Sequence, residues 1–133
     1  MPAQNNQTVV QTAIECFMRG DLDGVLARLA DDVIWEGPEK SELPYSGIYR
    51  GKSGVKEFFS GIGEVEVLSF EPREYLNAGN NVVVIGRWAG KVRTSGRSFQ
   101  TKWVLVFDVV DGKIKRFRDF EDSAPTAAAF RKS

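Results

Sequence analysis

Any acid–base chemistry in this chain must use side chains other than histidine, because the sequence contains none. Ser–His and Cys–His nucleophile pairs and histidine-ligated zinc sites are therefore excluded. A proton can still be moved near neutral pH by a carboxyl, tyrosine, lysine or cysteine side chain whose pKa its surroundings shift. We expect neither a metal ion nor a cofactor.

Arg87, Trp103 and Asp119 are expected to form one row across three neighbouring strands. The segments TSGR and VDGK each resemble a three-residue hairpin loop, a type I turn followed by a glycine bulge. Such loops place Arg87 opposite Trp103 and Trp103 opposite Asp119, on one face of the sheet. A two-residue Asp-Gly turn in the last hairpin would instead place Asp119 beside Val104 and Val106, facing away from Trp103.

The neighbouring rows give this face the character of a pocket wall. The row below is apolar and consists of Ile85, Leu105 and Phe117. Glu121 belongs to the row above, where we expect it to be solvated at the pocket mouth rather than catalytic. The predicted pocket has an apolar floor, one acid, one base and an aromatic plate, which suits a small hydrophobic organic molecule.

Asp119 and Arg87 can play catalytic or purely structural roles. Burial among apolar side chains would raise the pKa of Asp119 by desolvation, toward the range useful for a general acid or base. Arg87 would then bind an anionic group or stabilise a developing oxyanion. Alternatively, the two residues form an ion pair that steadies the sheet. Trp35 and Trp103 can stack on a planar ligand or serve only as core residues.

The apolar spacing predicts helices followed by strands. Helical spacing occurs at residues 10–17, 22–29 and 55–62. A short strand is predicted at 33–36, and a short helix after Pro125. A period of two predicts an antiparallel meander of strands near 64–76, 82–93, 97–109 and 113–121. This order is typical of an α+β fold, with N-terminal helices packed in a curved, mixed, mostly antiparallel sheet around an apolar pocket.

Residues 37–51 contain two prolines and three glycines, which predicts a loop. This loop can lie over the pocket. Its tyrosines, Tyr45 and Tyr49, can orient a substrate oxygen through a hydroxyl or simply pack. Of the two, we include Tyr49 among the candidate ligand-binding residues.

The segments DDVIWEGP, IYRGKSGVKEFF and VDGKIKRFRDFEDSA, in this order of elements, resemble the SnoaL-like polyketide cyclases over roughly residues 8–130. The wider group includes ketosteroid isomerases, limonene-1,2-epoxide hydrolases, scytalone dehydratase and nuclear transport factor 2. The resemblance implies their cone-shaped fold and places a working aspartate at Asp119. It places the arginine of the epoxide hydrolases at Arg87, but their second aspartate falls at Ala89. The histidine of the cyclases falls at Leu105, so neither catalytic set is complete.

The bulk composition narrows the function classes further. The chain has 133 residues, with 18 basic and 18 acidic side chains, a balance that argues against nucleic-acid or membrane-surface binding. A single cysteine, Cys16, excludes an internal disulfide. The polar N-terminal segment lacks the apolar core of a signal peptide. We therefore expect one cytoplasmic domain spanning residues 1–133.

These observations favour a cofactor-independent isomerase, cyclase, dehydratase or hydrolase that acts on a small hydrophobic substrate through Asp119. The alternative is a non-catalytic carrier or sensor that uses the same pocket, and a pure dimerisation module is a third reading. The opposite, convex sheet face is expected to carry Val84, Trp88, Val104 and Val106. An uncovered apolar face of this kind predicts a homodimer through it.

Overall fold

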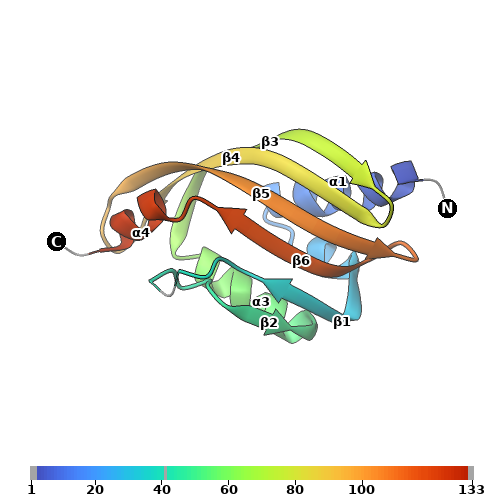
Figure 1. The fold of residues 1–133 in the computed structure, drawn as a ribbon. Helices are drawn as coiled ribbons and strands as arrows, with labels where there is room; N and C mark the ends of the chain where they lie inside the picture. The colour runs from blue at the N-terminus through green and yellow to red at the C-terminus, as the bar shows by residue number, and fades with distance from the viewer. Residues whose placement is uncertain (1–2, 41, 132–133) are drawn as a thin grey trace.

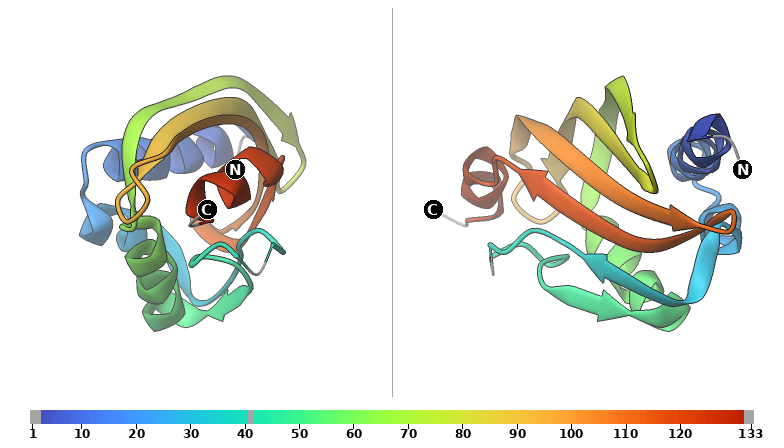
Figure 2. Two further views of the ribbon diagram at one scale, coloured as in Figure 1. Left: turned by 90° about the vertical axis from the view of Figure 1, so that its left-hand side faces the viewer. Right: turned by 45° about the vertical axis from the view of Figure 1, so that its right-hand side comes forward.

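The computed structural model describes residues 3–40 and 42–131, and in it a curved, unclosed sheet wraps around two helices (Figure 1, Figure 2). The helices are α1 (Ala3–Met18), α2 (Leu22–Ala27), α3 (Gly51–Ile62) and α4 (Ala124–Phe130). The strands are β1 (Leu29–Glu36), β2 (Ile48–Arg50), β3 (Val65–Ala78), β4 (Asn81–Val92), β5 (Ser98–Val110) and β6 (Lys113–Glu121). The predicted α+β class is thus confirmed.

The six strands lie in the order β2-β1-β6-β5-β4-β3. All neighbours are antiparallel except β1 and β6, which run parallel and place Trp35 beside Phe117. This pairing joins the early strand β1 to the last strand, so the inner face of the sheet is continuous from β3 to β1. α1 and α3 cover that face, and α4 lies across the end where β6 stops (Figure 2).

The β4–β5 hairpin differs from the predicted one by a single loop residue. The Val92 amide donates to the Arg97 carbonyl, which leaves a four-residue loop, 93–96, with Gly96 at φ 74°. Arg87 consequently pairs with Lys102 rather than with Trp103. Because side chains alternate along a strand, this shift moves Arg87 and Ile85 to the outer face. The prediction that these two residues line the pocket is therefore wrong.

The β5–β6 hairpin combines two irregularities. Asp111 and Gly112 form a two-residue turn with φ angles of 53° and 76°, values typical of a type I′ turn. A bulge then makes Lys115 an extra residue, since Val109 pairs with Ile114 and Asp108 with Arg116.

The two-residue turn alone would have placed Asp119 on the outer face of the sheet. The extra residue in the bulge returns its side chain to the inner face. Leu105 therefore pairs with Asp119, and Trp103 with Glu121. Asp119 keeps the inner face predicted for it, although its cross-strand neighbour is not Trp103 but Leu105.

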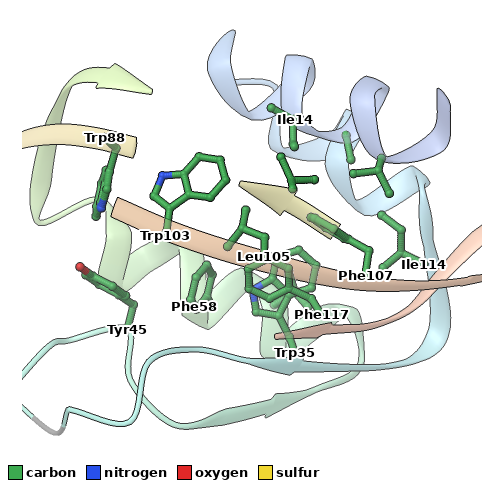
Figure 3. Packing of buried hydrophobic residues seen from close by; sticks show 14 of the residues in the cluster. Ile14, Trp35, Tyr45, Phe58, Trp88, Trp103, Leu105, Phe107, Ile114 and Phe117 are labelled. Atoms are coloured by element: carbon green, nitrogen blue, oxygen red, sulfur yellow. The ribbon is translucent and has the colours of Figure 1, made fainter. Parts of the chain in front are cut away.

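The core lies between the inner sheet face and the helices, and is rich in aromatic side chains (Figure 3). Val84 and Trp88 belong to this core, so the predicted composition of the outer face is wrong for both. Val104 and Val106 do lie on the outer face and are half-buried. The homodimer stays a prediction. Among the described residues, no helix is both long and apolar enough to cross a membrane.

Candidate active site

A cavity of about 80 Å³ lies inside the curve of the sheet. Every layer of the fold contributes aromatic side chains to its wall. Examples are Trp35, Phe58, Phe70, Trp88, Trp103 and Phe117. Two carboxyl groups, those of Asp119 and Glu121, interrupt this apolar lining near the end of β6.

Asp119 and Glu121 point to the same side because they are two residues apart on β6. Burial, and then the neighbouring charge and hydrogen bond of Glu121, raise the pKa of Asp119 well above its usual range. Burial also raises the pKa of Glu121, but hydrogen bonds with Asp119 and Trp88 oppose that rise. Two carboxyl groups in contact in an apolar site cannot readily both be ionised. The pair is therefore expected to hold one proton between its two groups, and the hydrogen bonds from Asp119 and Trp88 favour the ionised form of Glu121.

No cation neutralises this pair from within the cavity, since no lysine or arginine of the described chain lines it. Arg87 lies on the outer face, where its Nη2 atom donates to Gln100 Oε1 at 3.4 Å. The prediction that Arg87 and Asp119 form a structural ion pair is therefore wrong.

Tyr45 brings a hydroxyl group to the carboxyl pair from the loop between β1 and β2. The side chain is fully buried, and its ring meets that of Trp88 edge-on, with the ring centroids 6.4 Å apart. Figure 3 shows the Trp88 nitrogen and the Tyr45 oxygen at the same end of the cluster. Burial, together with the charges of Glu121 and Asp119, raises the pKa of Tyr45 far above its usual range. The hydroxyl therefore stays protonated and can donate a hydrogen bond.

Several polar atoms around the cavity lack a hydrogen-bond partner. Seven buried side-chain atoms in the described chain are unpartnered, and five belong to residues that line the cavity. They are Trp35 Nε1, Tyr45 Oη, Trp103 Nε1, Asp119 Oδ1 and Glu121 Oε2. An unsatisfied buried polar group costs roughly 1–3 kcal/mol. These atoms can form hydrogen bonds with a polar group placed in the cavity.

Stacking holds the two unpartnered indoles in place. The Trp35 ring stacks on Phe117 with centroids 4.0 Å apart, and the Trp103 ring stacks on Phe70 at 4.8 Å. Each indole ring is thus packed face to face against a second aromatic ring.

Gly86 provides the space in which Trp103 lies. It pairs with Trp103 across β4 and β5, and an added Cβ atom would lie 2.5 Å from the indole ring and closer still to the Glu71 carbonyl oxygen. We expect Gly86→Ala to displace Trp103 and lower the free energy of unfolding by about 1–3 kcal/mol, the usual cost of overpacking. Urea unfolding measures this cost, and a variant as stable as the wild type would contradict the assigned packing.

A second, outer cleft of about 640 Å³ borders the same carboxyl pair. The parallel pairing of β1 with β6 ends at Glu36 and Arg118. The cleft lies beyond this point, between residues 36–40 and the end of β6, and both Asp119 and Glu121 line it. Asp119 and Glu121 therefore contribute to the walls of both the inner cavity and this larger cleft.

The structure brings together only part of the predicted site. Asp119, Trp35, Trp103, Leu105 and Phe117 all line the cavity. By contrast, Arg87, Ile85 and Tyr49 do not.

Tyr49 instead donates its hydroxyl to the Ser46 carbonyl at 2.8 Å, within its own loop. The sequence-based choice missed Tyr45, which the same loop carries inward, and expected Glu121 to be solvated. The alternation of Asp119 and Glu121 along one strand was the signal that pointed to the second carboxyl group.

Comparisons with known proteins agree with this architecture. An NTF2-like protein from Burkholderia xenovorans is 31% identical, with a TM-score of 0.88, and the match covers 98% of this chain and 99% of that chain. TerC, crystallised with polyporic acid, is 26% identical, with a TM-score of 0.83 and coverage of 95% and 98%.

A protein from Xanthomonas campestris, provisionally assigned as a polyketide cyclase, shares the fold at 22% identity. Its TM-score is 0.78, and the match covers 96% of this chain and 98% of that chain. No curated protein matches the sequence. The profile of the SnoaL-like domain matches residues 10–117. This chain therefore belongs to the SnoaL-like domain family.

Proposed function

We propose that this protein is a cofactor-independent enzyme that moves a proton on a small, largely apolar carbonyl compound. The observation that carries the proposal is the buried Asp119–Glu121 pair, which has no cation beside it in the cavity and lies beside a buried tyrosine hydroxyl. Neighbouring buried acids with raised pKa values are typical of sites that need both a base and a proton donor.

The two carboxyl groups suit different steps of an enolisation. The Glu121 carboxylate, whose ionised form the hydrogen bonds from Asp119 and Trp88 favour, would remove a proton from the carbon next to the carbonyl group. The electron pair of that C–H bond would form a carbon–carbon double bond, and the π electron pair of the carbonyl group would move to its oxygen, which gives an enolate. Neutral Asp119 and Tyr45 would donate hydrogen bonds to this oxygen, where negative charge develops.

Return of the proton from Glu121 to a different carbon would complete an isomerisation. Return to the same carbon would only exchange the proton. In ketosteroid isomerase, a neutral carboxylic acid and a tyrosine stabilise the enolate in the same manner. TerC, the 26% identical relative, was crystallised with polyporic acid, which supports a small organic ligand for this chain as well.

A carrier or sensor of a hydrophobic ligand is the alternative that the test must separate. The aromatic wall alone would serve such a protein. In a carrier or sensor, a buried pair of carboxyl groups with no cation beside it would lower the stability of the protein without any benefit, because burying a charge costs free energy.

Hydrogen–deuterium exchange into a ketone tests the proposal without the natural substrate. Acetophenone, 1-indanone and 1-tetralone would each be incubated with the protein in deuterated buffer, and loss of the α-proton signals followed by NMR. We expect the wild-type protein to accelerate exchange of at least one ketone. Glu121→Gln should abolish this acceleration, while Glu66→Gln, which changes an exposed carboxyl group on β3, should retain it. Equal rates with wild type and Glu121→Gln would contradict proton transfer by Glu121.

A further inference from the structure

We infer that the substrate carries two hydrogen-bond acceptor oxygens at opposite ends of a flat apolar body, one beside the carboxyl pair and one facing Trp35. The inference rests on the proposed function in treating the ligand as a substrate. It uses the positions of the unpartnered donors, and not the chemistry of the carboxyl groups.

The first acceptor position lies at the end of the cavity near Glu121. Trp103 is the direct cross-strand neighbour of Glu121, and its Nε1 atom has no partner. The Tyr45 hydroxyl, also unpartnered, is close enough to both carboxyl groups for their charges to raise its pKa. An oxygen bound here would be the one that becomes negative during enolisation.

The second acceptor position lies farther along β6. Trp35 pairs with Phe117, whereas Trp103 pairs with Glu121. Phe117 and Glu121 are four residues apart on β6, and their backbone positions are about 13 Å apart at the usual rise of a strand. Figure 3 likewise shows the two indole nitrogens apart, with Leu105 between the rings, so we assign the unpartnered Trp35 Nε1 to a different acceptor from that of Trp103 and Tyr45.

The wall between the two positions is apolar. Leu105, Phe58 and Phe117 line it, and the Phe58 ring meets Phe117 edge-on at 6.2 Å. Flat hydrocarbon or aromatic groups suit the chemistry of such a wall, whereas a further polar group there would find no partner. Binding requires the aromatic side chains to move apart, because the cavity of about 80 Å³ is smaller than the roughly 150 Å³ of a cavity that holds benzene.

Water is a poor substitute for the second acceptor. A buried water molecule usually needs two to four polar partners, and the Trp35 end of the cavity offers one indole N–H among aromatic rings. A ligand oxygen carried by an apolar body avoids this requirement, because contacts of the body hold it in place.

A series of three benzenes with the same substitution pattern tests the two positions. They are 1,4-diethylbenzene with no oxygen, 4-ethylacetophenone with one, and 1,4-diacetylbenzene with one at each end. Isothermal titration calorimetry would measure the Kd of each. We expect the affinity of the wild-type protein to rise about tenfold with each acetyl group. This is the approximate net contribution of one hydrogen bond between uncharged groups.

Two variants assign the acceptors to their donors. Trp35→Phe and Trp103→Phe each keep an aromatic ring and remove one N–H group. Trp35→Phe should reduce the advantage of 1,4-diacetylbenzene over 4-ethylacetophenone to less than about twofold. Trp103→Phe should reduce it by a smaller factor, because the Tyr45 hydroxyl remains as a donor at the first position. The affinity for 1,4-diethylbenzene measures the packing change alone and serves as the internal control.

Three results would overturn the inference. The first is equal wild-type affinity for 1,4-diethylbenzene and 1,4-diacetylbenzene. The second is a variant that weakens all three ligands by the same factor, and the third is no binding of any ligand. A graded affinity without any deuterium exchange would instead refute the proposed proton transfer and leave the two acceptor positions intact.

Discussion

Glu121→Gln is expected to lower the turnover of a true substrate by at least about a hundredfold, the usual contribution of a general base. The amide keeps the shape of the side chain and can still accept the hydrogen bond from Trp88, but it cannot take up a proton. The loss should appear in kcat with little change in KM, because the apolar wall that binds the substrate is untouched. Steady-state kinetics on any ketone that exchanges deuterium measures both constants.

The matching change at Asp119 should have a smaller effect. Asp119→Asn still presents a hydrogen-bond donor to the developing enolate, since an amide N–H replaces the acid O–H. We therefore expect its kcat to lie between those of the wild type and Glu121→Gln. The reverse order would show that Asp119 is the base, and the exposed change Glu66→Gln should leave kcat unaltered.

The free energy of unfolding is expected to fall as the pH rises from about 5 to 8. In the unfolded chain, aspartate and glutamate lose their protons near pH 4, but burial raises the pKa values of Asp119 and Glu121 in the folded protein. The folded state therefore binds more protons than the unfolded state between these values. Linkage then makes stability decrease with pH, and the full stability is present only below the unfolded pKa values.

The double variant Asp119→Asn, Glu121→Gln removes both titrating groups and should flatten this part of the pH profile. At pH 8 we expect it to be more stable than the wild type by on the order of 1–3 kcal/mol, the usual cost of an unsatisfied buried group. Urea unfolding at pH 5 and pH 8 gives the comparison. A wild-type protein whose stability does not change between these pH values would contradict the buried carboxyl pair.

Hydrophobic periodicity predicted the types of the elements, but the faces depended on single loop residues. TSGR contains the glycine that the β4–β5 turn uses, but a glycine at this place suits a three-residue and a four-residue loop equally well and does not choose between them. Hydrogen bonding between Val92 and Arg97 selects the longer loop, and that one residue moves Arg87 out of the cavity. Local sequence does not determine this choice, because it depends on how both strands pack.

Asp119 reached its predicted face for a reason that the sequence did not reveal. The Asp-Gly turn is the short one that would have turned the side chain outward, and the bulge at Lys115 reverses its effect. The inward position of Tyr45 could not be predicted for a related reason. Its loop is closed by hydrogen bonds of Gly37 with Gly47 and of Gly47 with Pro38, and such closure carries no periodic signal.

The parallel pairing of β1 with β6 also has a consequence during synthesis on the ribosome. Trp35 leaves the ribosome early, but the strand that covers its edge is complete only when residue 121 has emerged. Contacts so distant in sequence raise the contact order, which slows folding. The aromatic wall of the cavity is meanwhile exposed on a nascent chain whose sheet has an open edge, the kind of species that aggregates or recruits chaperones.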